Sequence, residues 1–416
     1  MFSWAAGTEI AIWGTGRRAR KFFLRYRNVF KVKFFIDNFP TRKKMEGVKI
    51  LHPKEIGGVE RSIKTVIAIE DYFDVCRQCC DLGMRFFFDY LPYDLVEFNS
   101  INLIRLYELL EGKNVKEYLK MIMHDRAYAV LIGNCQIINI KRMLLGSKDF
   151  QAQYIMIDIP PVYAITESMA ESIEASRYVF EDCSLFVTQH ISRNNGYISF
   201  LSTDNIKSLM RENAHMVVIP TLYCDLYFPQ TVHQNKRNEL LKEVGVTVFP
   251  YGDFILNELA EKYSIDEIQR IVKWDNLFSV RLLQWHFRTA VTQMLERESK
   301  CDVTISDYIL ENFKKKQLFY TKNHPIESVF YELGVRILCK LGFEHDRVEN
   351  IRLQRLDSCQ ELIYPSVSKF YNFAFQKELY MDSLFDEECS IDEMVRMYLV
   401  CLDQDSKAWG SAGDEG

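Results

Sequence analysis

Short apolar runs alternate with amphipathic stretches over the first half of the chain, which is the pattern of an α/β fold. The apolar run at 9–13 leads into Gly14-Thr15-Gly16 and then into an amphipathic stretch that ends near Tyr26. This succession predicts a strand, a glycine turn and a helix. The pattern then repeats, with strands predicted over 32–36, 65–69 and 85–88 and a helix over 71–83. Together these elements predict a small Rossmann-like domain that ends near residue 98.

A second series of strands and helices follows a predicted helical hairpin. Leucines and other apolar residues recur at helical spacing from Ile101 to His124, with a break at Gly112. Polar loops then separate a new set of apolar runs, as the strands of a parallel sheet require. Strands are predicted over 127–132, 153–159, 184–188 and 215–220, and helices are predicted after Asn139 and over 166–178.

The chain becomes mainly helical between 253 and 345. A strand-like run, Gln317 to Thr321, interrupts the helices and is followed by Lys-Asn-His-Pro. Pro325 suits the first position of the helix predicted over 328–341. The pattern therefore divides the chain into a Rossmann-like domain (1–98), a helical linker (99–126), a second α/β domain (127–345) and a helical C-terminal extension (346–416).

Composition indicates a globular protein without a basic surface. Of 416 residues, 48% are hydrophobic and 26% are charged, and the formal net charge is −5. This balance argues against nucleic-acid binding, which needs a basic surface. No apolar run approaches the ~18 residues that span a bilayer, and no positively charged leader precedes the first strand, so we expect a cytoplasmic protein.

The eleven cysteines are scattered, and in a cytoplasmic chain of this length they are expected to be reduced thiols. Cys76, Cys79 and Cys80 form half of a zinc-binding pattern. No second cysteine or histidine pair follows at ligand spacing, so no metal site is predicted.

The segment from 127 to 145 carries the strongest candidate chemistry. A strand that is apolar on both faces runs into Gly133-Asn134-Cys135, and a helix follows. We expect Gly133 to take a backbone conformation closed to other residues and Asn134 to tolerate left-handed geometry. Cys135 would then meet the N–H groups and the positive dipole end of the helix, which lower a thiol pKa below ~8.5. The alternative is a small buried residue in a tight turn.

A nucleophilic thiol needs a base and donors for the developing oxyanion. His190 and His324 both follow apolar runs directly, and His324 is preferred because rigid neighbours would fix its ring. The Gly133 N–H, the Asn134 side chain and the Gln136 N–H are the expected oxyanion donors. Ligands bind at the carboxyl ends of strands in open α/β sheets, so Gln189, His190 and Arg193 are expected to line the same crevice as Cys135.

The loop Gly14-Thr15-Gly16-Arg17-Arg18-Ala19 has the spacing of a dinucleotide-binding turn, and Asp37 follows about 20 residues later. Its backbone N–H groups could hold a pyrophosphate. A single loop of this kind is weak evidence, and the residues from Asp37 to Pro40 could form a simple turn. Nucleotide binding through Gly14 and Gly16 and a scaffold role without ligand both stay open.

Four blocks of sequence carry a family resemblance. They are Leu-Ile-Gly-Asn-Cys-Gln (131–136), the Gln-His-Ile-Ser-Arg block from 189, Val-Ile-Pro-Thr-Leu-Tyr to Tyr-Phe-Pro-Gln (218–230) and Leu-Phe-Tyr-Thr-Lys-Asn-His-Pro (318–325). Over about 127–400 the chain resembles the WcbI-type polysaccharide biosynthesis family of coenzyme A-binding acetyltransferases. It departs from the family in its extra N-terminal domain and in His190, where a proline is expected.

The resemblance implies coenzyme A-dependent acetyl transfer to a sugar hydroxyl in capsular or surface polysaccharide biosynthesis, with Cys135 as the thiol centre. It implies acyl-CoA and a sugar or polysaccharide precursor as partners. The joint at Cys135 also resembles the nucleophile turn of SGNH-type hydrolases, so an SGNH-like catalytic domain is expected, and an esterase or deacylase of acylated sugars is the alternative. A non-catalytic scaffold of a glycan-assembly complex is a further alternative. The residues expected to contact coenzyme A are Gly133, Gln189, His190, Arg193, Lys141, Arg142 and Asn323.

Overall fold

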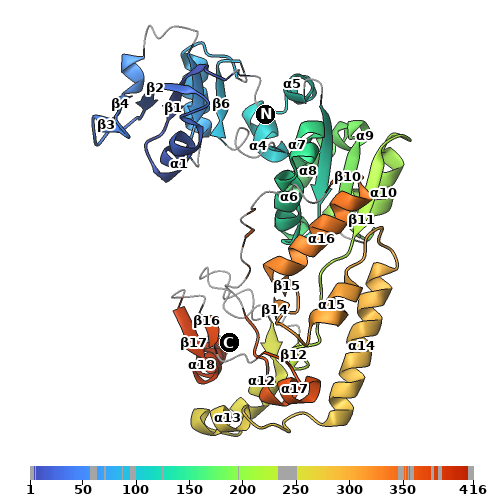
Figure 1. Cartoon of the computed structure of the whole chain (residues 1–416). Coiled ribbons are helices and arrows are strands. Elements are labelled where there is room, and N and C mark those ends of the chain that lie inside the picture. Colours follow the sequence, from blue (N-terminus) through green and yellow to red (C-terminus); the bar gives the residue numbers. More distant parts are fainter. Residues whose placement is uncertain are drawn as a thin grey trace. The chain divides into compact units, whose positions relative to one another are not determined.

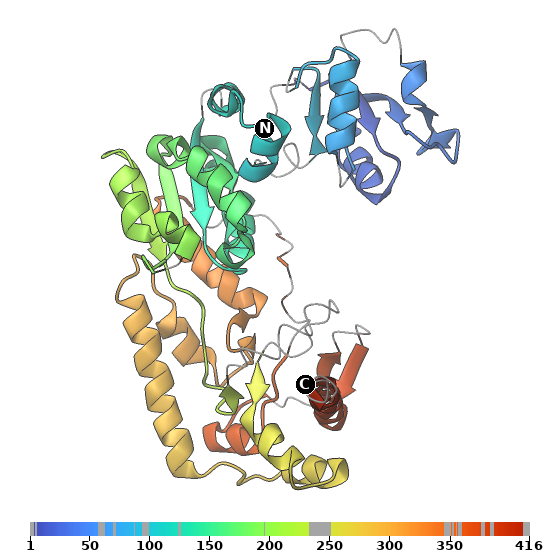
Figure 2. The ribbon, with the colours of Figure 1, turned by 180° about the vertical axis from the view of Figure 1, so that it is seen from behind.

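The computed structural model divides into two compact units (Figures 1 and 2). The first comprises Met1–Gly133 and Leu144–Met216, and the second comprises Asn134–Met143 and Val217–Gly416. The chain passes from one unit to the other between Gly133 and Asn134. The structure describes residues 4, 6–56, 63–69, 72–86, 88–93, 100–123, 126–194, 196–232, 251–344, 351, 353–354, 356, 360–375, 379–382 and 387–410.

The first sheet has the strand order of a Rossmann-like domain. Its strands lie in the order β3-β4-β2-β1-β5-β6, and all neighbours pair in parallel except β3 with β4. The central strand β1 is buried, as expected for the middle of a parallel sheet, and its Ile10 and Ile12 are 0% exposed. The elements are β1 (Glu9–Trp13), α1 (Arg17–Tyr26), β2 (Lys31–Ile36), β3 (Lys44–Met45), β4 (Val48–Leu51), β5 (Lys64–Ile67), α2 (Phe73–Asp81) and β6 (Tyr90–Pro92).

The strand predicted over 85–88 is wrong, since the last strand of this sheet is β6 at 90–92. The Asp89 carboxylate accepts hydrogen bonds from the Arg85 backbone N–H and Nε, both at 2.9 Å. These bonds close a turn where the apolar run predicted a strand. Burial alone would raise the pKa of the Asp89 carboxyl, but the hydrogen bonds, led by that from the Arg85 side chain, outweigh burial and lower this pKa to about 2.

The second sheet has five strands in the order β11-β10-β8-β9-β7. Three of its pairings, β7 with β9, β8 with β9 and β10 with β8, are parallel. The strands are β7 (Ser100–Asn102), β8 (Ala127–Ile132), β9 (Tyr154–Asp158), β10 (Leu185–Gln189) and β11 (His215–Ile219), and the helices around them are α4 (Leu103–Leu109), α5 (Val115–Met123), α7 (Lys148–Gln153), α8 (Glu167–Ala175), α9 (Tyr178–Asp182) and α10 (Thr203–Leu209).

The strands predicted from 127 to 220 are confirmed, but β7 was not predicted. It lies before the helical hairpin α4–α5, so the second sheet begins earlier in the chain than the pattern indicated. A strand of three residues is too short to show the alternation of apolar and polar positions from which strands are predicted. The domain boundaries expected at 98, 126 and 345 stay predictions.

The second unit contains helices and three two-stranded ribbons. The predicted helices around 254–263, 265–273, 285–297 and 328–341 are present. The elements are β12 (Thr231–Val232), β13 (Gly252–Asp253), α12 (Phe254–Ala260), α13 (Ile265–Ile271), α14 (Val280–Glu298), α15 (Ser306–Asn312), β14 (Phe319–Thr321), β15 (His324–Pro325), α16 (Glu327–Lys340), α17 (Pro365–Tyr371), β16 (Leu379–Asp382), β17 (Glu387–Ser390) and α18 (Ile391–Gly410).

The prediction that Pro325 starts a helix is wrong. It pairs with Phe319 in the hairpin of β14 and β15, and Thr321 pairs with His324. Helix α16 begins two residues later, at Glu327. The hairpin places His324 beside a tight turn at Lys322 and Asn323.

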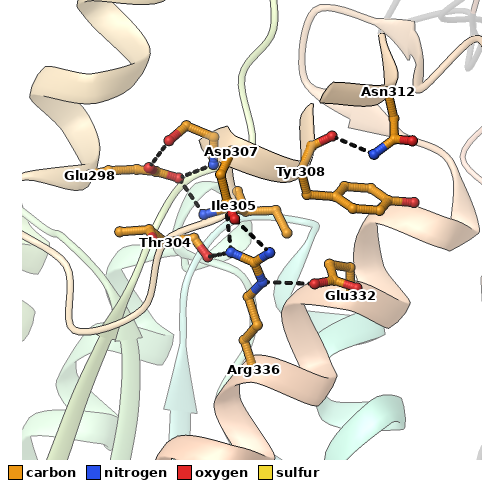
Figure 3. A network of polar contacts seen from close by, with 9 residues as sticks. Glu298, Thr304, Ile305, Asp307, Tyr308, Asn312, Glu332 and Arg336 are labelled. Carbon is orange, nitrogen blue, oxygen red and sulfur yellow. Dashed lines mark hydrogen bonds and ion pairs between the residues drawn. The ribbon is translucent and has the colours of Figure 1, made fainter. Parts of the chain in front are cut away.

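A polar network joins α14, α15 and α16 (Figure 3). Glu298, at the end of α14, is 5% exposed and accepts hydrogen bonds from the backbone N–H groups of Ile305 (2.6 Å) and Ser306 (2.8 Å) at the start of α15. Arg336 of α16 donates to both carboxylate oxygens of Asp307, at 2.6 and 2.9 Å, and lowers the pKa of that carboxyl. The Asp307 pair is bidentate, the geometry that orients a guanidinium most firmly.

Helix α16 also packs closely against α6 (Ile137–Gly146), the helix that follows Cys135. A Cβ added at Gly334 would lie 2.7 Å from the Cβ of Met143. No change of side-chain rotamer can move a Cβ atom, so a side chain at Gly334 would push the two helices apart.

We predict that Gly334→Ala lowers the free energy of unfolding by about 1–2 kcal/mol, because overpacking outweighs the ~1 kcal/mol that alanine gains over glycine in a helix. Urea unfolding of the variant and the wild type measures the difference. Equal or higher stability in the variant would contradict close packing at this position.

Candidate functional site

The joint between β8 and α6 is held by side chains rather than by unusual backbone angles. The Asn134 Oδ1 accepts a hydrogen bond from the Gln136 N–H at 2.9 Å, which turns the chain into the helix. Neither Gly133 nor Asn134 has a positive φ, so the expected special conformations are wrong. A Cβ added at Gly133 would lie 2.6 Å from the Gln189 Oε1, the end of a flexible side chain, so Gln189 would have to move.

Gln136 hydrogen-bonds two distant segments of the second unit. Its side chain is 0% exposed, and its Nε2 donates to the carbonyl oxygens of Leu222 (2.8 Å) and Asn323 (2.7 Å). Its Oε1 accepts from the Leu222 N–H at 2.9 Å. Cys135 precedes Gln136 and His324 follows Asn323, so the bond to Asn323 connects the immediate neighbours of the candidate nucleophile and base.

Asn139, one turn further along α6, is bonded in the same way. Its amide donates to the Gln354 carbonyl at 2.9 Å and accepts from the Gln354 N–H at 2.7 Å. Both amides satisfy backbone groups that would otherwise be buried without partners. The start of α6 is therefore fixed relative to three segments far away in sequence.

We predict that Gln136→Leu destabilises the protein by at least about 3 kcal/mol, because it leaves three buried groups unpaired, the Leu222 N–H and two carbonyl oxygens, and each costs about 1–3 kcal/mol. Urea unfolding measures the loss. Gln293→Leu, at an exposed position of α14, is the matched control and should change stability little. Similar stability of the two variants would contradict a fixing role for Gln136.

Cys135 is partly buried, and its environment differs from the one predicted. Burial raises the pKa of the thiol above its ordinary value, although the backbone N–H groups of Cys135 and Gln136 act in the opposite direction. The predicted lowered pKa is therefore wrong, because loss of solvent outweighs the N–H groups. The Gln136 N–H is also bonded to Asn134, which weakens its expected role as an oxyanion donor.

We predict that Cys135 of the ligand-free protein is mainly a thiol at neutral pH. Its alkylation rate with iodoacetamide should reach half its maximum above pH 9.0, the ordinary value. Peptide mapping by mass spectrometry after timed quenching gives the rate for each cysteine, with the exposed Cys339 as an internal reference. A half-maximum below pH 8 would restore the thiolate first predicted from sequence.

His324 is half-buried in the hairpin of β14 and β15. Burial lowers its pKa from 6.5 to about 4, and its Nδ1 is buried without a hydrogen-bond partner. The ring is therefore neutral at pH 7, as a general base must be. Before a ligand binds, the candidate base is therefore a neutral imidazole and the candidate nucleophile a neutral thiol.

Two tyrosines and a lysine of the second unit were not predicted. Burial is the largest cause of the raised pKa values of Tyr223 and Tyr251, and the charge of a Cys135 thiolate contributes to both. The Lys322 Nζ lies 4.2 Å from the centroid of the Tyr251 ring.

Lys322 and its surroundings form a buried polar group. Burial lowers the pKa of Lys322, although the negative charges of Asp225 and Glu361 oppose this shift. The Glu361 carboxylate accepts from the Lys322 N–H at 2.8 Å, and burial raises the pKa of this carboxyl to about 7. A small cavity of about 20 Å³ borders Tyr251, Glu361 and Asp253, whose pKa burial also raises to about 7.

The structure places several predicted ligands of coenzyme A without testing their role. Gln189 lies against Gly133, and His190 is exposed. Arg193 is also exposed and forms an ion pair with Asp204 at 3.3 Å. Lys141 and Arg142 are half-buried on α6, and burial lowers the pKa of Arg142. These residues stay predicted ligands.

The N-terminal glycine loop is closed by its own side chains. Gly14 has a φ of +120°, and an added Cβ would lie 2.7 Å from Ile69. The Thr15 hydroxyl donates to the Asp37 carboxylate, whose other oxygen accepts from the Phe39 N–H at 2.8 Å. Asp37 thus orders a turn, while nucleotide binding at Gly14 and Gly16 stays a prediction.

The described residues contain neither a cluster of metal-ligating side chains nor a membrane-spanning helix. Within them, no group of three or more His, Cys, Asp and Glu side chains could hold a metal ion. In the same part of the chain, no helix has the length and apolar character needed to cross a membrane.

The fold and site define an α/β protein with two mainly parallel sheets and a half-buried cysteine at the start of a helix. The model of the polysaccharide biosynthesis enzyme WcbI matches residues 128–346, more than half of the chain. The chain therefore belongs to the WcbI family of polysaccharide biosynthesis enzymes, as the sequence resemblance predicted.

One solved structure supports the fold. A structure of WcbI, described as a novel polysaccharide biosynthesis enzyme, matches with a TM-score of 0.57 at 17% identity, covering 69% of this chain and 93% of that chain. It is described as the native protein without a disulfide bond between coenzyme A and one of its cysteines. Anabolic ornithine carbamoyltransferase from Campylobacter jejuni matches at 15% identity over 51% of this chain and 74% of that chain, with a TM-score of 0.19 that carries no weight. No curated protein matches the sequence.

Proposed function

We propose that the protein is a coenzyme A-dependent acyltransferase that transfers an acetyl group to a sugar hydroxyl during surface or capsular polysaccharide biosynthesis. The observation that carries the proposal is the hydrogen bond from Gln136 to Asn323, at 2.7 Å, between the neighbours of Cys135 and His324. Membership of the WcbI family supports the substrate class. The description of a related structure mentions coenzyme A together with a cysteine.

Cys135 and His324 would act in two half-reactions. Cys135 gives its proton to the neutral His324 imidazole, and its sulfur forms a bond with the acetyl carbonyl carbon while the bond to the coenzyme A sulfur breaks. The coenzyme A thiolate takes up the proton. A sugar hydroxyl then gives its proton to His324 and attacks the acetyl-enzyme, which restores the Cys135 thiol. One thioester replaces another in the first step, so that step is close to neutral in energy.

The coenzyme A thiol end would lie beside Cys135, and basic groups such as Arg193, Lys141 and Arg142 would meet its phosphates. Gly133, Asn323, Gln189 and His190 complete the proposed contacts. Burial around the thiol suits a thioester, since excluding water limits hydrolysis of an acetyl-enzyme.

The alternative function is an SGNH-like esterase or deacylase that removes acyl groups from sugars. It would use water in place of the sugar hydroxyl and would need no coenzyme A. A non-catalytic scaffold is the other alternative. Transfer requires both acyl-CoA and a hydroxyl acceptor, whereas hydrolysis requires only an ester and water.

We predict that the protein incubated with acetyl-CoA alone gains the mass of one acetyl group on Cys135. Intact-mass analysis of a rapidly quenched sample, followed by peptide mapping, measures the adduct. Cys135→Ser should lose most of the activity, because a serine hydroxyl is a far poorer nucleophile beside a base as weak as His324.

Direct attack of the sugar on bound acetyl-CoA is the competing mechanism. It would give no adduct, and Cys135→Ala would keep more than about a tenth of the rate, a loss below ~1.4 kcal/mol of transition-state stabilisation. Deacetylation of an acetylated sugar without coenzyme A would instead support the esterase. Cys339→Ala, at an exposed position on α16, is the control for a cysteine outside the site.

A further inference from the structure

The imidazole of His324, the proposed base, is not oriented through its Nδ1. In many sites with a nucleophile and a base, a third group bonds the base and fixes its direction. Here the Nδ1 atom is buried, and within the described part of the chain no group forms a hydrogen bond with it. The direction of the ring therefore depends on the backbone that carries it, which is the tight turn between β14 and β15.

Three segments that are distant in sequence hold this turn. The Gln136 Nε2 donates to the Asn323 carbonyl at 2.7 Å, and the Cys224 N–H donates to the Lys322 carbonyl at 2.7 Å. The third segment contributes Glu361, whose Oε2 accepts a hydrogen bond from the Lys322 N–H at 2.8 Å. Both backbone polar groups of Lys322 are thus bonded, and one of them is bonded by a carboxylate.

We propose that Glu361 is a positioning residue for His324. Its carboxylate holds the turn that carries the imidazole, and in this way it fixes the ring and limits the access of water to it. The proposal rests on the proposed acyl transfer, in which His324 is the base. It assigns Glu361 no contact with the reacting atoms.

Glu361 is itself firmly placed. Its Oε1 accepts a hydrogen bond from the Thr231 hydroxyl of β12, while its Oε2 accepts from the Lys322 N–H. Its backbone N–H donates to the Tyr320 carbonyl of β14 at 2.9 Å. Glu361 therefore contacts the hairpin at two points, once through its backbone and once through its side chain. Because these bonds already order the side chain, holding the turn costs little further conformational entropy.

The turn is short, so a bond at Lys322 acts close to the imidazole. Thr321 pairs with His324 across the hairpin, and Lys322 and Asn323 connect them. The Thr321 hydroxyl also donates to the Asn323 Oδ1 at 2.9 Å, which ties the turn together. A displacement of the Lys322 N–H therefore moves backbone that is only two residues from the ring.

The pKa of His324 reports whether the turn is held. Burial is the cause of its lowered pKa, so water that reaches the ring would raise this pKa toward 6.5. The cavity of about 20 Å³ that borders Glu361 and Tyr251 has room for about one water molecule. Without the carboxylate, the Lys322 N–H would need another acceptor, and water would supply it.

Holding the turn does not require the charge of Glu361. Burial raises the pKa of its carboxyl to about 7, although the hydrogen bonds from Thr231 and Lys322 act in the opposite direction. A protonated carboxyl can still accept from the Lys322 N–H with one oxygen and donate to the Thr231 hydroxyl with the other. A glutamine side chain can form the same two bonds, whereas a leucine side chain can form neither. Glu361→Gln and Glu361→Leu therefore separate charge from position.

The first measurement does not depend on acyl transfer. Nuclear magnetic resonance of the full chain with isotope-labelled histidine follows the His324 imidazole from pH 8 to pH 5 in the wild type, Glu361→Gln and Glu361→Leu. The chain has eight histidines, and the signal that is missing in His324→Gln identifies the ring. Glu393→Leu is the matched control, because the Glu393 carboxylate also accepts from one backbone N–H and one hydroxyl, both of Ser390, at 2.7 and 2.8 Å.

The second measurement uses acetyl-CoA as the probe. Rapid quenching followed by intact-mass analysis gives the rate of Cys135 acetylation in the same proteins. Titration calorimetry gives the dissociation constant of coenzyme A, and thermal unfolding checks the fold of each variant.

We expect the His324 imidazole to stay neutral down to about pH 5 in the wild type, Glu361→Gln and Glu393→Leu, and to titrate with a midpoint above about pH 5.5 in Glu361→Leu. Glu361→Leu should also acetylate Cys135 at least about tenfold more slowly, because a small misplacement of a catalytic group costs up to about 10² in rate. The dissociation constant of coenzyme A should not change. Glu361→Gln should keep a rate within about threefold of the wild type, since it keeps both hydrogen bonds.

Two results would overturn the proposal. One is a His324 ring that stays neutral to pH 5 in folded Glu361→Leu. The other is a loss of rate in Glu361→Gln as large as that in Glu361→Leu, which would assign the effect to charge. If Glu361→Leu does not fold, Thr231→Val replaces it, because it removes one of the two bonds of the carboxylate; it should shift the His324 titration in the same direction by less, and an unchanged titration would overturn the proposal.

Failure of the proposed function would look different. A wild type that gains no acetyl group, together with a shifted His324 titration in Glu361→Leu, would overturn acyl transfer and support the hold of Glu361 on the turn. An active wild type with an unshifted titration and an unchanged rate in Glu361→Leu would overturn the role of Glu361 alone.

Discussion

The candidate site depends on the buried side-chain amide of Gln136. One primary amide offers two donor hydrogens and two acceptor lone pairs, and here it satisfies both backbone groups of Leu222 and the carbonyl of Asn323. The partners lie 86 and 187 residues away in sequence. An apolar side chain of the same size could fill the volume but would leave three backbone groups unsatisfied. The amide is therefore what makes the start of α6, the loop at Tyr223 and the hairpin at His324 one structure.

Burial around this amide decides the chemistry of the resting site. The same exclusion of water raises the pKa of the Cys135 thiol and lowers the pKa of His324. Both shifts favour the neutral form, so no thiolate–imidazolium pair is expected before a ligand binds. An acyl thioester is uncharged at its reacting end and suits such an environment. Hydrogen bonds to the developing oxyanion are also stronger there than in water, which increases the importance of any fixed donor.

The sequence was sufficient to predict the longer helices and strands. It was also sufficient to identify Cys135 and His324 as candidates, because each follows an apolar run. Short, mainly apolar runs predicted β1, β2, β8 and β10, since a buried parallel strand needs such a run. The strand β7, with three residues, and the hairpin of β16 and β17 carry no such signal. Cys135 could be predicted as a candidate because it stands between a strand and a helix. The direction of its pKa shift could not be predicted from sequence. That shift depends on how far segments distant in the chain, such as 222–225 and 322–324, exclude water from the thiol, and the local pattern does not reveal those contacts.

Tyr223, Tyr251 and Lys322 illustrate the same limit from the side of function. Tyr223 stands in one of the sequence blocks that carry the family resemblance, yet its spacing to Cys135 contains no chemical information. Its loop reaches the start of α6 only because Leu222 is bonded to Gln136, and Cys224 is bonded in turn to Lys322. In the proposed acyl transfer, the groups recognised from sequence, a thiol and an imidazole, handle the bond and the proton. Their placement depends on the Gln136 side chain, which joins segments 86 and 187 residues away. No local pattern of apolar and polar residues encodes such a bond.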